Sequence, residues 1–190
     1  MTTTVPIVNL DEKTYAKQEL RQKVRRRRAG YSQDELDGLS LLATAKLLKT
    51  LHWQEAHTVL LYHSLPDELS TGRLIQRAVE QGKQVLLPVV VGDDLELREY
   101  TSEQQLAEGA FHIQEPQGEA STDYDAIDLA VVPGVAFSSD LFRVGRGRGY
   151  YDRLLPRLTK AVKCGICWPF QFFQQVPTEP HDARLDAIVV

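Results

Sequence analysis

The stretch from Pro133 to Arg153 holds the residue types in this chain that are best suited to chemistry. Within it, arginines alternate with glycines around one valine: Arg143, Val144, Gly145, Arg146, Gly147, Arg148 and Gly149. Glycine lets the backbone turn its N–H groups toward a ligand. Guanidinium groups bind phosphate oxygens in pairs and stay charged at all relevant pH values. The pattern therefore predicts a phosphate-binding loop.

Two aromatic rings and a carboxylate follow this loop directly, as Tyr150, Tyr151 and Asp152. An aspartate beside a phosphate is repelled unless a cation lies between them, so Asp152 predicts Mg²⁺. Two alternatives for Asp152 stay open: a carboxylate in the first turn of a helix, or a partner for Arg153. The spacing matches neither G-x-x-x-x-G-K-[ST] nor G-x-G-x-x-G, so a solvated surface turn is also an alternative for the loop.

Together with other segments, this stretch resembles the signature of the 5-formyltetrahydrofolate cyclo-ligase family. The matching segments follow the family's order and approximate spacing: 17–21, 62–71, 87–88, 115–116, 133–137, 143–153 and 177–182, with Asp186 near the end. Three positions depart from the family pattern. The family usually has Asp where Ser138 stands, Gly where Leu141 stands, and often Gly or Lys where Arg148 stands. None of these changes removes a group that the chemistry requires.

The resemblance implies an enzyme that uses ATP and Mg²⁺ to convert 5-formyltetrahydrofolate into 5,10-methenyltetrahydrofolate, ADP and phosphate. It implies catalytic roles for Arg143, Arg146, Arg148 and Tyr151, and metal binding by Asp152 and Asp182. The ATP-binding residues that it implies are Lys17, Gln18, Glu19, Leu20, Arg21, Arg143, Val144, Gly145, Arg146, Gly147, Arg148, Gly149, Tyr150 and Tyr151. The folate-binding residues that it implies are His63, Glu68, Arg146, Gly147, Arg148, Gly149 and Tyr150.

Glu68 and Asp182 have simpler interpretations when the family is set aside. A carboxylate after a proline is commonly the first-turn residue of a helix, which would describe Glu68. Asp182 is equally well described as a loop aspartate in a turn. The resemblance instead implies that Glu68 meets the polar pterin ring and that Asp182 is a second carboxylate on the metal.

Further basic residues recur at helical spacing on one face of the segment 12–28: Lys17, Arg21, Arg25 and Arg28. They fit an RNA-binding ridge, a solvated helical face paired with acidic side chains, or a second clamp on nucleotide phosphates. The resemblance favours the clamp for Lys17 and Arg21 only. The run 25–28 is then left at the surface.

The pair Cys164 and Cys167 matches the C-x-x-C spacing of redox and metal sites. The flanking run 161–168 is apolar and predicts a strand, on which positions three apart point to opposite faces. The two sulfurs then could not pair or share a metal, and no second cysteine pair completes a zinc site. Buried structural thiols are expected.

The composition bounds the class of protein. With 190 residues, 43% of them hydrophobic, the chain can bury one sizeable core, and a single domain over 1–190 is expected. A net charge of −4 argues against a general nucleic-acid binder. No apolar run approaches a membrane span, and the polar start lacks a signal-peptide core. A cytoplasmic monomer that acts on a small molecule is expected.

The hydrophobic pattern alternates between helices and strands. Helices are predicted over 12–28, 33–51, 71–81 and 149–158, the second opened by a capping box at Ser32 and Glu35. Strands are predicted over 58–62, 84–91, 95–100, 124–132, 161–168 and 187–190, and a long loop over 109–125. This order predicts an α/β fold: a three-layer α/β/α sandwich around a mainly parallel mixed sheet, which is also the family's fold. Ligands of such sheets gather at the carboxyl ends of the strands, where the run from Pro133 begins.

Two other classes of function stay open at this level. A non-catalytic nucleotide or sugar-phosphate binder would account for the glycines and arginines but not for Glu68 or the paired aspartates. An RNA-binding protein would account for the run 25–28. An enzyme acting on another folate-like or thiamine-like substrate also fits, since a phosphate loop carries no information on the pterin.

Overall fold

The computed structural model describes residues 12–102, 106–108 and 114–190. Its helices are α1 (Glu12–Arg28), α2 (Gln33–Leu48), α3 (Leu51–Glu55), α4 (Gly72–Glu80) and α5 (Tyr150–Leu154), with 3₁₀ turns η3 (Tyr124–Ala126), η4 (Leu155–Arg157) and η5 (Pro169–Gln171). Its strands are β1 (Thr58–Leu60), β2 (Gln84–Val91), β3 (Asp94–Tyr100), β4 (Leu106–Glu108), β5 (Gln114–Pro116), β6 (Ala120–Ser121), β7 (Leu129–Val132), β8 (Ala136–Ser138), β9 (Arg143–Val144), β10 (Val162–Ile166), β11 (Phe172–Phe173) and β12 (Ala187–Val189).

The central sheet has seven strands in the order β12-β10-β7-β1-β2-β3-β6. The neighbours from β12 to β2 pair in parallel, and β3 and β6 add antiparallel pairs at one edge. Every residue of β1 and β7 is buried, as expected for parallel strands covered on both faces. The predicted mainly parallel mixed sheet is confirmed.

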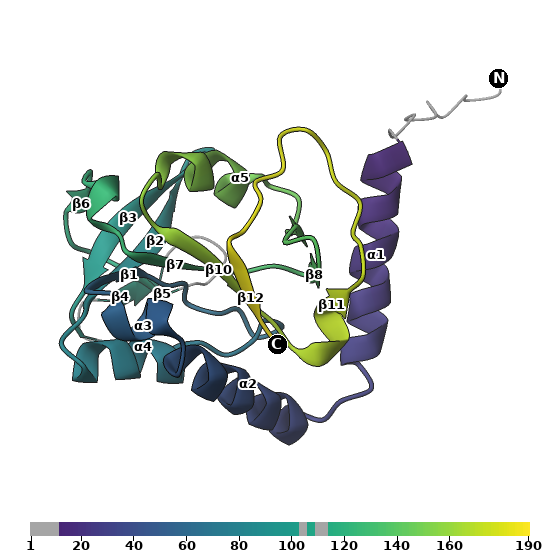
Figure 1. The fold of residues 1–190 in the computed structure, drawn as a ribbon, viewed down its shortest axis with the longest axis horizontal. Coiled ribbons are helices and arrows are strands. Elements are labelled where there is room, and N and C mark those ends of the chain that lie inside the picture. The colour runs from purple at the N-terminus through teal and green to yellow at the C-terminus, as the bar shows by residue number, and fades with distance from the viewer. Residues whose placement is uncertain (1–11, 103–105, 109–113) are drawn as a thin grey trace.

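Helices cover both faces of this sheet (Figure 1), with α2, α3 and α4 below it and α5 above it. Neighbouring residues of one strand belong to different core clusters: Val131 packs with Trp53 and Leu47, whereas Val132 packs with Leu154 and Leu158. This alternation is what a strand with a core on each side requires. The predicted three-layer sandwich is therefore confirmed. Helix α1 stands apart from these layers and packs against β8 and η5.

Local signals account for several helix ends. The Ser32–Glu35 capping box begins α2 as predicted. The predicted helix 33–51 is wrong at its end, because α2 stops at Leu48 and the Thr50 side chain caps the new helix α3. Gly82, with a φ of +70°, follows the end of α4.

Two other expectations are corrected. The predicted loop 109–125 holds strands β5 and β6 and the turn η3, while its residues 109–113 lie outside the described residues. The strand predicted over 124–132 begins only at Leu129. Strands β8 and β9 of a small sheet, of order β11-β8-β9, follow it, and β9 leads into the glycine-rich loop.

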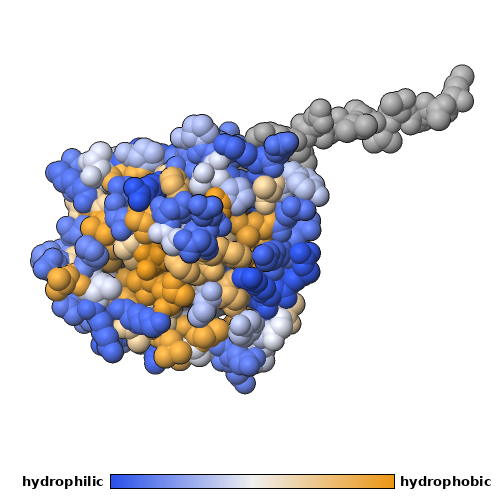
Figure 2. Space-filling view, turned by 45° about the vertical axis from the view of Figure 1, so that its right-hand side comes forward, coloured by the Kyte–Doolittle hydropathy of each residue, from blue (hydrophilic) through white to orange (hydrophobic). Residues whose placement is uncertain are grey.

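The surface in Figure 2 carries hydrophilic side chains around most of its rim and apolar ones toward its middle. Among the described residues, no helix combines the length and apolar character that crossing a membrane requires.

Candidate active site

A cavity of about 710 Å³ opens at the carboxyl edge of the central sheet. Tyr62 follows β1, Pro133 follows β7, and Val90 lies near the end of β2, and all three line the cavity. Strands from one parallel sheet end at the same edge, which is why residues far apart in the sequence meet there. The far wall comes from α1 and from the segment 179–182.

All but two of the predicted site residues line this cavity: Lys17, Gln18, Arg21, His63, Glu68, Arg143, Val144, Gly145, Arg146, Gly147, Arg148, Gly149, Tyr150, Tyr151, Asp152 and Asp182. Glu19 and Leu20 are absent from the lining of the cavity. On α1, Glu19 is exposed and Leu20 is half-buried and packs against the core, so their ATP-binding roles stay predictions.

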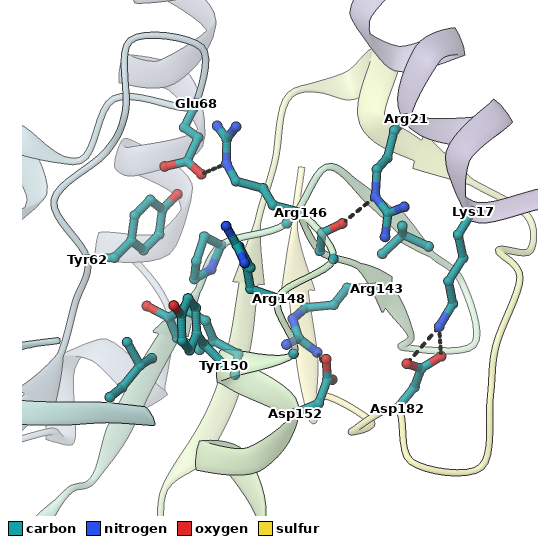
Figure 3. A pocket seen from close by; sticks show the side chains of 18 of the residues that line it. Lys17, Arg21, Tyr62, Glu68, Arg143, Arg146, Arg148, Tyr150, Asp152 and Asp182 are labelled. Atoms are coloured by element: carbon teal, nitrogen blue, oxygen red, sulfur yellow. Dashed lines mark hydrogen bonds and ion pairs between the residues drawn. The ribbon is translucent and has the colours of Figure 1, made fainter. Parts of the chain in front are cut away.

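The glycine-rich loop depends on two left-handed backbone positions. Gly147 has a φ of +101° and Gly149 a φ of +70°, values that other residues adopt at a cost. Arg21 reaches this loop from α1, and its Nε donates a hydrogen bond of 2.8 Å to the Gly145 carbonyl. A Cβ on Gly147 would lie 3.4 Å from the Arg21 guanidinium. The loop and α1 are therefore held together, as Figure 3 shows.

Arg143 is the buried cation of the loop, with 4% of its surface exposed. Its guanidinium donates to Asp152 Oδ1 at 2.9 Å, and the same oxygen accepts the Ala183 N–H at 3.2 Å. The guanidinium also lies 5.9 Å from the centre of the Tyr151 ring. Buried Arg143 Nε and the Tyr151 hydroxyl have no hydrogen-bond partner among the described residues. Such groups carry a desolvation cost that a ligand could remove.

Arg146 forms an ion-pair cluster at the cavity rim. Its Nε donates to Glu68 Oε1 at 2.9 Å, and its terminal nitrogen contacts Asp67 Oδ1 at 2.5 Å. Glu68 Oε2 accepts the Leu65 N–H at 2.9 Å. Burial raises the pKa of Asp67, but its bond and charge contact with Arg146 outweigh this and lower the pKa. This cluster places Glu68 at the mouth of the cavity.

Arg148 differs from the other loop arginines. Figure 3 shows its side chain pointing into the space between Glu68 and Arg143. The side chain is exposed, and it makes no hydrogen bond or ion pair with any residue that the structure describes. Its guanidinium is therefore available to a ligand anion.

Lys17 lies against two carboxylates from the segment 179–182. Its Nζ contacts Glu179 Oε2 at 2.5 Å and the two Asp182 oxygens at 2.9 and 2.7 Å. Burial lowers the pKa of Lys17, but these hydrogen bonds and charges outweigh it, so the pKa is raised. The Lys17 hydrogen bond lowers the pKa of Glu179. His181 lies nearby, and its Nε2 is 3.8 Å from Glu179 Oε2.

An apolar wall faces this charged side, and its members were not predicted as site residues. It includes Tyr62, Leu65, Pro88, Val90 and Leu95. Burial raises the pKa of the Tyr62 and Tyr151 hydroxyls, so both stay protonated. The wall offers a dry, flat-sided surface suited to a ring system.

Comparisons with known proteins identify the family to which this chain is similar. The model of the 5-formyltetrahydrofolate cyclo-ligase family matches residues 13–190. The chain belongs to this family. The NMR structure of the Aquifex aeolicus 5,10-methenyltetrahydrofolate synthetase has a TM-score of 0.81 and 34% sequence identity, covering 91% of this chain and 88% of that one. The 5-formyltetrahydrofolate cyclo-ligases of Mus musculus and Escherichia coli (strain K12) are each 28% identical, over 92% and 87% of this chain and 93% and 95% of their own lengths.

Two departures from the pattern expected for the cyclo-ligase family lie at the end of β8 and in the turn that leads to β9. Leu141 has a φ of +71°, a left-handed conformation that glycine adopts without strain. Its N–H donates to the Ser138 carbonyl at 2.9 Å, and its carbonyl accepts the Leu185 N–H at 2.9 Å. The Ser138 hydroxyl donates to Asp140 Oδ1. The turn keeps the geometry that a glycine would allow, and it still positions Arg143 at the start of the loop.

The C-x-x-C prediction is confirmed. Cys164 packs in the core cluster on one face of the sheet and Cys167 in the cluster on the other. Both thiols are free, and burial raises the pKa of each to about 12. They carry no redox or metal chemistry as a pair.

The predicted surface position of the run 25–28 holds for Arg25, Arg26 and Arg27, which are exposed, whereas Arg28 is half-buried. The last two arginines also make hydrogen bonds to the backbone of other segments. Arg27 donates to the Phe170 carbonyl at 2.9 Å, and Arg28 donates to the Pro66 carbonyl at 3.0 Å. These bonds tie α1 to the cavity's surroundings.

Proposed function

We propose that this chain catalyses the ATP- and Mg²⁺-dependent cyclisation of 5-formyltetrahydrofolate to 5,10-methenyltetrahydrofolate, with release of ADP and phosphate. The observation that carries the proposal is the two-sided cavity. One side holds a glycine-rich loop with Arg143, Arg146 and Arg148, and the other side is an apolar wall. The charged side fits a triphosphate, and the apolar side fits a pterin ring.

The chemistry explains why a phosphate loop would serve a ring closure. The oxygen of a formyl group bonded to nitrogen resembles an amide oxygen and is a poor leaving group. In the proposed reaction it attacks the γ-phosphorus of ATP, ADP departs, and the oxygen becomes a phosphate ester. N10 then adds to the activated carbon and loses its proton, and the carbon–oxygen bond breaks to release phosphate. The protein's task is positioning and charge neutralisation.

Each side chain has a role that its position supports. The loop backbone, Arg143 and Arg148 would bind the phosphates, with Gln18 and Arg21 beside them on α1. Lys17 would join them by exchanging its carboxylate partners for phosphate oxygens. Tyr150 and Tyr151 would pack against the bound rings, and His63 and Glu68 would lie at the pterin end.

The donor set also fits Mg²⁺. The ammonium of Lys17 already lies between Asp182 and Glu179, so carboxylate oxygens on this wall attract a cation. Asp152 Oδ1 is engaged by Arg143, and no described residue donates to its Oδ2. Carboxylate oxygens are the ligands that Mg²⁺ prefers. We assign Asp152 and Asp182 to the ion, which would neutralise phosphate charge when bound.

Every side chain to which the proposal gives a role comes from a single chain, so the proposed reaction requires no second copy, and we propose that the chain acts as a monomer. The two free buried cysteines agree with the reducing conditions of the cytoplasm.

The test is a spectrophotometric assay for 5,10-methenyltetrahydrofolate with 5-formyltetrahydrofolate, ATP and Mg²⁺ present, and with each omitted in turn. We expect product only in the complete mixture, with one ADP formed per methenyl group. Binding of ATP without product or ADP release would instead identify a non-catalytic nucleotide binder. Turnover that persists without ATP would exclude the phosphorylation step.

A further inference from the structure

Glu115 is a cavity carboxylate to which the proposed function gives no task. It lies in the middle of β5, a short strand that packs over β2 and β3. Only 7% of its surface is exposed, yet it lines the cavity. Its neighbours on that wall include Pro88, Val90 and Leu95, none of which carries a charge.

The hydrogen bonding of Glu115 is incomplete. Its Oε1 accepts one long hydrogen bond, of 3.4 Å, from the Val90 N–H. Its Oε2 accepts no hydrogen bond from any described residue, and no cation of the described chain pairs with it. A carboxylate that is largely buried and accepts one long hydrogen bond from the described residues is placed to accept hydrogen bonds from a ligand in the cavity.

The other carboxylates of the cavity are all paired with a cation. Glu68 accepts from Arg146, Asp152 accepts from Arg143, and Asp182 accepts from Lys17. In addition, Glu68 uses its second oxygen for the Leu65 N–H. Among the described carboxylates of this cavity, Glu115 is therefore the one without a cationic partner.

We propose that Glu115 binds the donor edge of the substrate's heterocycle and thereby contributes to its selection. Two carboxylate oxygens match two adjacent N–H donors, and such charged hydrogen bonds are strong in a dry site. Resting on the proposed function, the matching edge is the pterin N3–H and its 2-amino group. Adenine fits less well, because its 6-amino group stands beside N1, an acceptor that a carboxylate repels. A metal ion fits less well too, since the described residues of this wall supply no second carboxylate.

The first test measures ligand affinity by calorimetry, with each ligand alone. We expect Glu115→Leu to weaken 5-formyltetrahydrofolate binding by about 10- to 100-fold, the range for lost charged hydrogen bonds, and to leave ATP affinity unchanged. Glu115→Gln keeps one acceptor oxygen, so its affinity for 5-formyltetrahydrofolate should lie between those of Glu115→Leu and the unaltered chain. The matched control is Glu119→Leu, an exposed glutamate on the same segment that does not line the cavity. It should bind both ligands as the unaltered chain does.

The second test changes the ligand and so does not depend on a variant folding. An analogue of 5-formyltetrahydrofolate with a methyl group in place of the 2-amino group should bind the unaltered chain about 10-fold more weakly or worse. In Glu115→Leu, the affinities for the two ligands should differ much less, because the carboxylate that would accept from the 2-amino group has been removed.

Equal binding of both ligands by the unaltered chain would overturn the inference, as would a Glu115→Leu variant that loses affinity for ATP rather than for the folate. Either result leaves the proposed function standing if the unaltered chain still turns over. If the complete assay mixture yields no product, the proposed function fails and this inference falls with it.

Discussion

The two sides of the cavity differ in how far their polar groups are paired within the protein. On the charged side, Lys17, Arg143 and Arg146 each have carboxylate partners within 2.9 Å. On the apolar side, the Tyr151 hydroxyl has no partner among the described residues, and Glu115 has only one long hydrogen bond. These three cations are thus paired before a ligand arrives, unlike the exposed Arg148, whereas the Tyr151 hydroxyl and Glu115 have few or no hydrogen-bond partners among the described residues.

This difference indicates how each side would meet a ligand. The charged side is organised by partners that a phosphate can replace, because guanidinium and ammonium groups exchange one oxyanion for another at similar distances. In our proposal, the apolar side would gain hydrogen bonds from a bound ligand to Tyr151 and Glu115. Changes on the charged side should therefore alter both turnover and stability, and changes on the apolar side mainly ligand affinity.

Arg143→Ala tests the charged side most severely. Removing one well-placed cation costs about 3 kcal/mol of transition-state stabilisation, so turnover should fall by roughly two to three decades. The variant should also melt at a lower temperature, because Asp152 loses its buried partner. Steady-state assays on folded protein, with melting curves, measure both effects.

Arg143→Lys should restore part of both properties, since it returns the charge. Arg157→Ala removes an exposed arginine that contacts Tyr124 away from the cavity and should turn over normally. If Arg143→Ala matched the unaltered chain in turnover, the phosphate-loop assignment would be wrong.

Gly147→Ala tests whether the left-handed backbone conformation within the loop is needed on the charged side. At a φ of +101° a side chain is strained by roughly 1–2 kcal/mol, which predicts a rise of about 10-fold in the KM for ATP. Gly145→Ala is the matched control. Gly145 has no positive φ, and a Cβ added to it would meet no atom within 4 Å, so its KM should barely change. Equal effects at both glycines would show that strain is not the cause.

Tyr151→Phe tests the apolar side. We expect the ligand-free protein to be as stable as the unaltered chain or more so, because a buried hydroxyl without a partner is removed. We expect the KM for the folate to rise about 5-fold, the effect of one lost neutral hydrogen bond. Tyr124→Phe is the control: its hydroxyl accepts from Arg157 outside the cavity, so turnover should not change. A large loss of ligand-free stability in Tyr151→Phe would contradict the proposed open hydroxyl.

The Lys17–Glu179 pair predicts the smallest effect, a change in acid stability. The pKa of Glu179 is lowered on folding, so its contribution is present above its usual pKa of 4.5 and is lost as the pH falls through the lower folded value. Glu179→Gln should therefore be less stable than the unaltered chain at pH 7, with the difference shrinking below about pH 4.5. Urea denaturation at several pH values measures this. A difference that stays constant down to strongly acidic pH would exclude the ion pair as its cause.

The sequence predicted the layers and most elements because hydrophobic periodicity reports burial directly. Strand β2 matched the predicted range 84–91, and the apolar runs of β7 and β10 identified the centre of the sheet. It missed β5 and β6, because these strands have only three and two residues and carry little apolar pattern. It also missed the small sheet around β8, whose strands of two or three residues carry too little pattern.

Site residues were predicted correctly as cavity-lining where the family motif is a continuous loop that faces the cavity. The loop 143–152 lines the cavity throughout, whereas the run 17–21 does so only through Lys17, Gln18 and Arg21. The family motif names the whole run, and it does not distinguish the helix positions that line the cavity from those that do not. The contact of Lys17 with Asp182 joins residues 165 positions apart, and no local pattern encodes it.

The opposite placement of Cys164 and Cys167 gives the molecule a reporter on each side of its sheet. With thiol pKa values of about 12, neither reacts with an alkylating reagent until its own layer opens. The two labelling rates, followed by mass spectrometry, therefore tell whether the layers come apart together or in turn, and whether nucleotide or folate slows one of them more.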